Sequence, residues 1–237
     1  MAPALPRIVA LGDAAILADF SDTLDLAVNA RIQQLAEAIR RRKAEWIVDV
    51  VPALGSLAVH FDPERYTLHV PPLEAAATLV KECLSRKLSD LSELVRTVEV
   101  PVCYDEDFGP DLAEVAGRCK LTKEEAIHRH CASAHRVLMV GFAPGHPYIG
   151  GLDERLSVPR RTTPRPVVVA GSVAIANAQS VVYPFTISGG WSILGRTPLT
   201  IFDAHRDPPA LVAPGDRVKF VAIGRQEFDR IARGRAK

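Results

Sequence analysis

The spacing of apolar residues changes once along the chain, and this change limits the folds that the chain can adopt. The first helical stripe repeats at spacings of four and three, through Leu24, Val28, Ile32, Leu35 and Ile39. Beyond residues 135–142 helical spacing disappears. Short apolar runs are then separated by Pro, Gly and Asn, which is typical of strands joined by tight turns. The sequence therefore predicts two domains, residues 1–92 and residues 93–237.

The first domain is predicted to be a small α+β sandwich. Its first helix begins at a cap formed by Ser21 or Asp22, and its second helix carries the stripe Leu73, Ala77, Val80, Leu84 and Leu88. Short apolar runs predict four strands, over residues 7–12, 15–20, 46–51 and 55–61. A sheet with both helices on one face would bury the apolar side of each element.

The second domain is predicted to be a closed or nearly closed antiparallel barrel. Two short helices, Asp111–Arg118 and Thr122–Ala134, precede it. The apolar runs expected to form strands cover residues 166–171, 172–177, 180–185, 199–202 and 218–223, and a turn at Pro214 leads into the last of them. The connections between these runs are too short for crossover helices, which favours a barrel.

Charge and composition narrow the class of partner. Lys and Arg number 29 against 28 for Asp and Glu, so no overall field attracts the protein to nucleic acid or to an anionic membrane. The first residues lack the pattern of a signal peptide, and no run approaches the roughly 18 apolar residues of a membrane span. We therefore expect a cytoplasmic enzyme or binding protein that meets neither nucleic acid nor membrane.

The cysteines and histidines do not predict a metal site. The four cysteines contain no close pair, which argues against a zinc ribbon or a dithiol redox centre. His128, His130, Cys131 and His135 lie close in sequence, but on a helix positions two apart point to different faces. We interpret these four as ordinary surface and core residues.

Four loops rich in Gly and Pro are the candidate binding elements: residues 141–151, 158–166, 170–180 and 187–198. Glycine lets a backbone approach a ligand closely, and proline fixes a loop before binding, so that little entropy is lost. Arginines beside these loops suit a small anionic ligand. The alternative is structural: Gly and Pro turn the barrel strands, and the arginines pair with Asp153, Glu154 and Asp203.

Six motifs in these loops, in order and spacing, resemble those of the KipI family, also called the 5-oxoprolinase B subunit (PxpB) or allophanate hydrolase subunit 1. They are VGFAPGHPYIGGLDERL, the PR pairs at Pro159 and Pro164, AGSVAIA, GGW and GRTP. Upstream, VVPALGSLAVHFDP and VPVCYDEDFGPDLAEVA fit the same family, so the resemblance covers nearly the whole chain. It implies an N-terminal α+β domain followed by a cyclophilin-like β-barrel.

The same resemblance implies a function shared among several chains. A KipA-type partner (the 5-oxoprolinase C subunit, or allophanate hydrolase subunit 2) is expected, with a LamB/YcsF-type protein, the A subunit, as a possible third component. The complex would use ATP to open the lactam ring of 5-oxo-L-proline to L-glutamate. Two alternatives stay open: a subunit that processes allophanate in a urea pathway, which a biotin-dependent partner would favour, and a non-enzymatic inhibitor of a histidine kinase.

We expect the following residues to form the site. His146 is the candidate catalytic residue, because it stands where the family usually has an aromatic residue, and its imidazole could donate a hydrogen bond or transfer a proton; the alternative is that it replaces one ring by another. The candidate substrate-binding residues are Tyr148, Arg160, Arg165, Gly171, Ser172, Gln179, Gly189, Gly190, Trp191 and Arg196.

The sequence offers more hydrogen-bond donors than nucleophiles. It contains no G-x-x-x-x-G-K-[ST] loop, no G-x-G-x-x-G and no G-x-S-x-G elbow. We therefore expect the chain to bind an anionic substrate or intermediate, while a partner protein completes the site.

Overall fold

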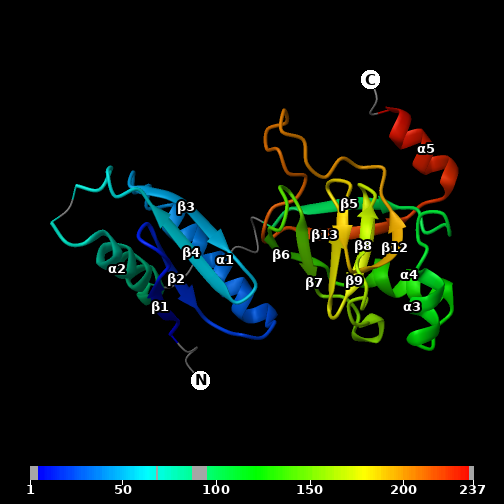
Figure 1. Cartoon of the computed structure of the whole chain (residues 1–237), viewed down its shortest axis with the longest axis horizontal. Coiled ribbons are helices and arrows are strands. Elements are labelled where there is room, and N and C mark those ends of the chain that lie inside the picture. Colours follow the sequence, from blue (N-terminus) through cyan, green and yellow to red (C-terminus); the bar gives the residue numbers. More distant parts are fainter. Residues whose placement is uncertain (1–4, 68, 87–94, 235–237) are drawn as a thin grey trace. The chain divides into compact units, whose positions relative to one another are not determined.

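The computed structural model describes residues 5–67, 69–86 and 95–234 (Figure 1). The chain divides into two compact units, Met1–Val95 and Arg96–Lys237. The predicted domain boundary near residue 92, and Leu88 of the second apolar stripe, lie outside the described residues.

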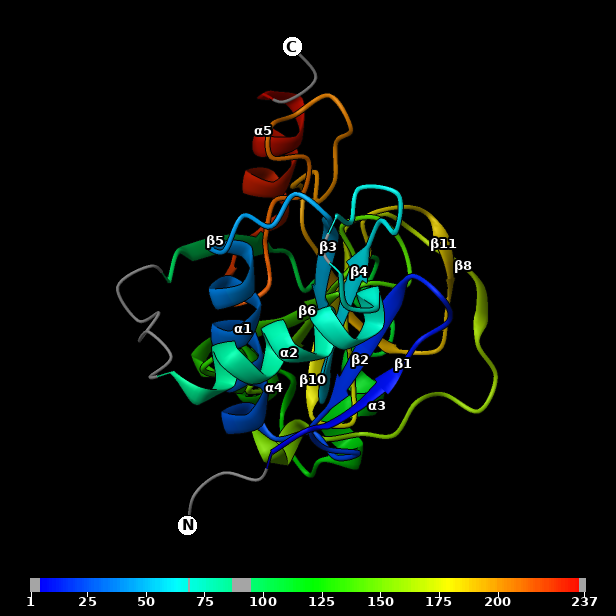
Figure 2. The same cartoon turned by 90° about the vertical axis from the view of Figure 1, so that its left-hand side faces the viewer.

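The first unit is an antiparallel sheet with two helices, as predicted. The strands follow the order β1, β2, β4, β3, and their bounds are β1 Arg7–Ala10, β2 Ala15–Asp19, β3 Ile47–Pro52 and β4 Ser56–Phe61. Helices α1 (Leu26–Arg40) and α2 (Pro72–Ser85) pack side by side (Figure 2). Along β4, Leu57, Val59 and Phe61 are buried in the core shared with both helices, while the alternate residues are half-buried.

The start of α1 differs from the prediction. The N-cap is Asp25, whose carboxylate accepts hydrogen bonds from the backbone N–H groups of Ala27 at 2.7 Å and Val28 at 3.1 Å. The Ser21 hydroxyl instead donates to the carbonyl of Thr23, which forms a local turn. Ser21 and Asp22 were therefore wrong as caps, and Leu24 lies before the helix rather than in its stripe.

The second unit is built on a seven-stranded sheet in the order β12, β9, β10, β7, β6, β13, β5. The strand bounds are β5 Thr97–Val102, β6 Arg136–Val140, β7 Pro147–Gly150, β9 Ser172–Ala176, β10 Gln179–Val182, β12 Ser192–Arg196 and β13 Arg217–Ala222. Five neighbouring pairs are antiparallel, but β13 and β5 run parallel. The barrel prediction is confirmed, and the expectation that it is antiparallel throughout is wrong at this one pair.

The two edge strands of this sheet meet and nearly close the barrel. Cys103, just after β5, and Arg196, at the end of β12, exchange two backbone hydrogen bonds of 2.9 Å each. This approach requires glycine at position 195, because a Cβ there would lie 2.6 Å from the carbonyl oxygen of Cys103. Inside the barrel, Val173 and Ile175 contribute to the main core of the unit.

A two-stranded ribbon covers part of the outer face of the sheet. It consists of β8 (Arg165–Val168) and β11 (Ile187–Gly189), paired antiparallel. Val168 from the ribbon packs with Ala174 and Val181 from the sheet in a second small core. This arrangement places the loops on either side of the ribbon next to the outer face of the barrel.

The helices of the second unit are short. Their bounds are α3 Leu112–Arg118, α4 Lys123–Ala132, the 3₁₀ helix η2 Glu154–Leu156 and α5 Arg225–Gly234. The first two were predicted, and α4 begins with a capping box formed by Thr122 and Glu125. Helix α5 was not predicted, and the predicted strand 199–202 is wrong: within it the structure forms only an isolated bridge between Phe202 and Ala210.

Candidate functional site

The strand register brings four predicted substrate-binding residues to the outer face of the barrel sheet. Tyr148 in β7 pairs with Val181 in β10, so both side chains share one face, and Gln179 lies two positions before Val181 on that face. The pairing of β10 with β9 puts Ser172 on the same face, and Arg196 lies opposite Ser172 in β12. These four positions are spread over 49 residues of sequence, yet they share one surface.

Aromatic rings gather at one part of this face, in a group that we term the aromatic cluster: His146, Tyr148, Tyr183 and Trp191. The ring centroids of His146 lie 5.2 Å from those of Tyr148 and of Tyr183, and those of Tyr148 and Trp191 are 6.0 Å apart. The His146–Tyr183 and Tyr148–Trp191 pairs meet edge to face, a contact that aromatic pairs favour, while His146 and Tyr148 are tilted by 52°. Three of the four rings are buried, and Tyr148 is the half-buried member through which the cluster reaches the surface.

His146 is neutral at physiological pH. Only 2% of the residue is exposed, and this burial lowers the pKa of His146 to about 4, because the charged imidazolium would lose its hydration. The Nδ1 atom is buried and has no hydrogen-bond partner among the described residues. A neutral imidazole has one donor and one acceptor nitrogen, so His146 is not a cationic group, and its predicted catalytic role stays a prediction.

Gly189 and Gly190 differ sharply in their surroundings. A Cβ at Gly189 would lie 2.1 Å from the phenol oxygen of Tyr183, so only glycine allows this close approach. A Cβ at Gly190 would lie 3.6 Å from its nearest neighbour, an ordinary contact with Pro164. Burial raises the pKa of Tyr183 to about 12, so its hydroxyl keeps its proton near neutral pH.

Next to the aromatic cluster lies a groove of about 220 Å³, which we term the arginine groove. It is lined by residues 159–163 together with Glu114, Arg118 and Ser192. Arg160 joins the two features, because it lines the groove and its guanidinium carbon stands 5.4 Å from the ring centroid of Trp191. Among the described residues, Arg160 makes no ion pair, whereas Arg118 and Arg161 both pair with Glu114.

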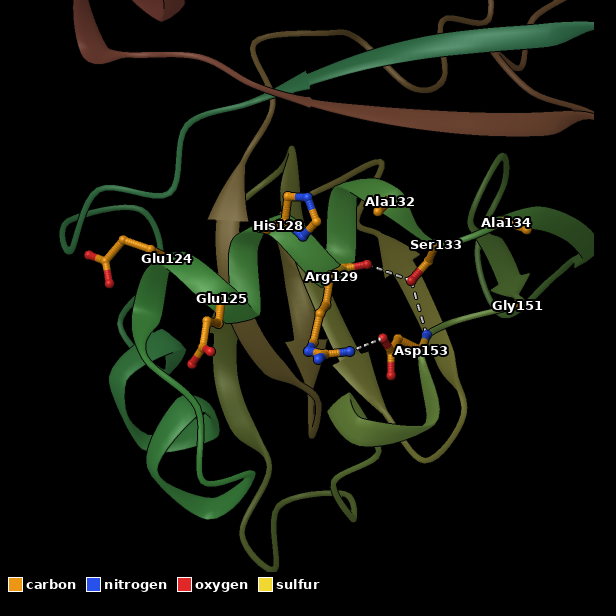
Figure 3. Close-up of a pocket in the computed structure, with 9 residues that line it drawn as sticks. All are labelled: Glu124, Glu125, His128, Arg129, Ala132, Ser133, Ala134, Gly151 and Asp153. Atoms are coloured by element: carbon orange, nitrogen blue, oxygen red, sulfur yellow. Dashed lines mark hydrogen bonds and ion pairs between the residues drawn. The ribbon is translucent and has the colours of Figure 1, made fainter.

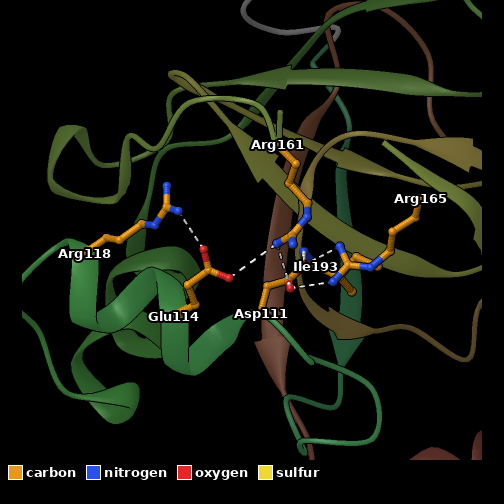
Figure 4. A network of polar contacts seen from close by, with 6 residues as sticks. All are labelled: Asp111, Glu114, Arg118, Arg161, Arg165 and Ile193. Atoms are coloured by element: carbon orange, nitrogen blue, oxygen red, sulfur yellow. Dashed lines mark hydrogen bonds and ion pairs between the residues drawn. The ribbon is translucent and has the colours of Figure 1, made fainter. Parts of the chain in front are cut away.

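A buried carboxylate, Asp111, binds arginine side chains beside this groove (Figure 4). Arg165 donates two hydrogen bonds to it, at 2.8 and 2.6 Å, and Arg161 donates a third at 3.1 Å. The backbone N–H of Ile193 donates to the same carboxylate at 2.7 Å. The guanidinium of Arg165 thus binds within the protein, and its predicted contact with substrate stays a prediction.

Gly171, Ser172 and Arg196 lie together where β9 begins and β12 ends. The Nε of Arg196 donates to the carbonyl of Ala170 at 2.9 Å, and Thr197 donates its N–H to the carbonyl of Gly171. Burial lowers the pKa of Arg196. These contacts link loop 170–171 to the point where the barrel closes.

A larger groove, of about 710 Å³, lies along α4 and contains none of the predicted site residues (Figure 3). Its lining residues are Glu124, Glu125, His128, Arg129, residues 132–134, Gly151 and Asp153. Arg129 and Asp153 pair at 2.8 Å, and the Ser133 hydroxyl donates to the carbonyl of Arg129 while it accepts from the N–H of Asp153. Three of its polar residues are thus already paired with one another, which favours the aromatic cluster and the arginine groove as the site.

Two of the clustered histidines, His130 and His135, lie in the interior of the second unit. His130 and His135 are buried, and their ring centroids lie 4.5 and 4.8 Å from that of Phe220. The hydroxyl of Tyr104 hydrogen-bonds Nδ1 of His130 at 2.8 Å. In the part of the chain that the structure describes, no group of three or more His, Cys, Asp and Glu residues is arranged to hold a metal ion.

Sequence reasoning did not single out three residues that shape the site. Tyr183 sits in an apolar run and was interpreted as strand, while Asp111 was interpreted as a helix boundary. Arg161 was passed over although the RR pair at Arg160 was visible. A buried carboxylate near a doublet of arginines is the signal that would have found this network, but its partners lie 50 and 54 residues away.

The fold and the site define an α+β unit followed by a barrel with a binding face lined by rings and arginines. The chain belongs to the family of the carboxyltransferase domain, subdomain C and D, whose model matches residues 6–212. This agrees with the resemblance seen in the sequence. Within the described ranges, none of the helices has the length and apolar character that a membrane crossing requires.

Comparisons with known proteins agree with this family. The chain is 39% identical to the 5-oxoprolinase B subunit of Bacillus subtilis (strain 168), over 94% of this chain and 95% of that protein. The solved structure of TTHA0988 matches with a TM-score of 0.76 and 34% identity, over 88% of this chain but only 40% of the other. The urea carboxylase of Kluyveromyces lactis shares the fold alone: the TM-score is 0.71 at 19% identity, over 96% of this chain and 23% of that one.

Proposed function

We propose that this chain is one component of an ATP-dependent 5-oxoprolinase complex, which opens the lactam ring of 5-oxo-L-proline to give L-glutamate. It acts in this proposal with a KipA-type and a LamB/YcsF-type protein. The observation that carries the proposal is the 39% identity to the 5-oxoprolinase B subunit of Bacillus subtilis, over nearly the full length of both chains.

The geometry of the site supports a small cyclic substrate with a negative charge. Tyr148, the half-buried member of the aromatic cluster, offers flat surface to a five-membered ring, and the buried ring of His146 packs against it. Arg160, which makes no ion pair among the described residues, lies at the edge of the cluster and suits an anionic group on the same ligand.

The same geometry supports a site that is completed by other subunits. The sequence contains no Walker-type phosphate loop and no G-x-S-x-G elbow, so the chain itself supplies positioning and hydrogen bonds. In TTHA0988 the matching region is 40% of a longer chain, which is consistent with a module that works beside further polypeptide. We place ATP hydrolysis with the assembled complex.

The test is glutamate release and ATP hydrolysis dependent on 5-oxo-L-proline. Both are measured for the chain alone and for the chain co-purified with a KipA-type and a LamB/YcsF-type protein. We expect activity in the assembled complex and none in the isolated chain. A complete complex that turns over allophanate and leaves 5-oxo-L-proline intact would replace this proposal with the urea-pathway alternative.

A matched pair of variants links this activity to the site. In the complex, Arg160→Gln removes the unpaired guanidinium at the aromatic cluster and should lower activity strongly. Arg230→Gln removes an exposed arginine that pairs with Glu227 on α5, and it should leave activity unchanged. Equal activity of the two variants would remove Arg160 from the proposed site.

A further inference from the structure

The arginine groove contains a cation that its own surroundings do not neutralise. Glu114 lies between Arg118 and Arg161, at 2.8 and 3.4 Å, and Asp111 lies between Arg161 and Arg165 (Figure 4). In the described part of the chain the guanidinium of Arg160 meets no carboxylate; its contact is the face of Trp191. With Arg160 counted, four arginines face two carboxylates, which leaves a formal charge of +2.

Hydroxyl donors stand beside this charge and have no partner. Ser192 is 7% exposed and lines the groove, and its hydroxyl makes no hydrogen bond to any described residue. Thr162 and Thr163 are exposed; within the described ranges their hydroxyls and backbone N–H groups make no hydrogen bond and are free to donate to a ligand. The Ser192 hydroxyl keeps some exposed surface, and because Ser192 lines the groove this hydroxyl can donate to a ligand there.

The groove is held in place before any ligand arrives. The backbone N–H of Arg161 donates to the carbonyl of Gly190 at 2.8 Å, which ties loop 159–163 to the start of β12. The Arg161 side chain is fixed by Asp111, which is 3% exposed and also fixes the N–H of Ile193. A fixed group of cations and donors binds an anion at low entropic cost.

We propose that the arginine groove is a binding site for a phosphoryl dianion, held by Arg160 and by the hydroxyls of Thr162, Thr163 and Ser192. A phosphoryl group carries about two negative charges near neutral pH and has three acceptor oxygens, which matches the charge and the donors of the groove. A carboxylate has one charge and two oxygens, so it fits less well. This inference deepens the proposed function. Binding of a phosphoryl group does not depend on that function, but the identity of the molecule that carries the group does.

The test is binding of inorganic phosphate to the isolated full-length chain. The chain contains two tryptophans, and Trp46→Phe leaves Trp191, whose ring faces Arg160, as the single tryptophan, which can be excited selectively over tyrosine. At constant ionic strength we expect a saturable change of Trp191 fluorescence. Saturable shifts of the backbone amide resonances of Thr162, Thr163 and Ser192 in a ¹H–¹⁵N spectrum are a second reading that does not depend on the indole.

Two variants decide whether the site is the groove. Arg160→Gln should raise the Kd for phosphate by at least about tenfold. Arg230→Gln, which removes an exposed arginine of the same unit, should leave the Kd unchanged. A response that does not saturate, that acetate reproduces at the same ionic strength, or that survives Arg160→Gln in the amide shifts overturns the proposal.

The same binding experiment, repeated with ATP, identifies the molecule that carries the phosphoryl group. ATP that binds more tightly than phosphate, with the same sensitivity to Arg160→Gln, identifies a nucleotide as the ligand. Equal affinities identify a free phosphate or a small phosphorylated molecule. These measurements use the isolated chain, so their outcome does not depend on the activity of the complex. The phosphoryl site can therefore be confirmed even if the complex does not act on 5-oxo-L-proline, and it can be overturned even if the complex does.

Discussion

Asp111 and Arg165 form a bidentate pair across 54 residues of sequence, with hydrogen bonds of 2.8 and 2.6 Å. The carboxylate is 3% exposed, so its charge depends on these donors and on those of Arg161 and Ile193. The pair connects the segment before α3 to the start of the β8–β11 ribbon. A contact of this kind fixes the loop that carries Arg160 and thereby shapes the arginine groove.

Removal of Arg165 should destabilise the barrel unit. Arg165→Ala deletes two charge-assisted hydrogen bonds to a buried carboxylate and should lower the free energy of unfolding by about 2 kcal/mol. Urea unfolding followed by Trp191 fluorescence, in the Trp46→Phe background, measures this change. Lys219→Ala, which breaks an exposed pair with Glu99 in the same unit, should cost under about 1 kcal/mol. Equal losses in the two variants would show that the Asp111 pair is no stronger than a surface ion pair.

The order of the elements was predictable from the sequence, because helical stripes and short apolar runs are local signals. The runs over residues 172–177 and 218–223 became β9 and β13. Helix α5 was not predicted, because few of its residues are apolar. Its buried residue, Phe228, packs on Phe108, which is far away in the sequence. The parallel pairing of β5 with β13 is likewise set by packing between distant segments, which no local pattern records.

The candidate site was predictable only in part, for the same reason. The glycines, arginines and aromatic residues of the loops were visible as unusual residue types. Which of them meet depends on the register of β7, β9, β10 and β12, and that register is a tertiary property. The sequence alone therefore could not show that Arg165 meets Asp111 while Arg160 makes no ion pair among the described residues.

The two adjacent glycines of the GGW motif should respond differently to alanine. Gly189→Ala would place a Cβ 2.1 Å from the hydroxyl of Tyr183, a buried side chain that would have to shift. We expect a loss of about 1 to 3 kcal/mol in the free energy of unfolding, together with weaker ligand binding. Gly190→Ala meets only an ordinary contact and should stay within about 0.5 kcal/mol of the parent. Thermal or urea unfolding of both variants checks this, and a tolerated Gly189→Ala would show that Tyr183 moves freely.

His146→Phe separates packing from chemistry at the candidate catalytic position. Phenylalanine keeps a ring against Tyr148 and Tyr183 and removes the unpaired Nδ1, so the stability of the barrel unit should be unchanged or higher by about 1 kcal/mol. If the imidazole hydrogen-bonds the substrate, kcat of the assembled complex falls while the folded state is intact. His146→Ala, which also loses the ring contacts, should cost about 2 to 4 kcal/mol. Full activity of His146→Phe would leave His146 with a packing role only.

Stability of the barrel unit should fall as the pH falls from about 6.5 to about 4. His135 and His146 have pKa values lowered to about 4 by burial, below the ordinary value of 6.5, and burial also lowers the pKa of His130. Between these values the unfolded chain binds protons that the folded chain excludes, so protonation favours unfolding. Stability is fully present above the unfolded pKa and is lost as the pH drops through the folded one, by about 3 kcal/mol each for His135 and His146. Urea midpoints read from Trp191 fluorescence at a series of pH values measure how stability depends on pH.

A pair of histidine variants is the control for this pH dependence. His135→Phe should weaken it, whereas His205→Gln, at an exposed position, should leave it unchanged. A parent protein with equal midpoints at both ends of this range would contradict the neutral, buried state of these rings.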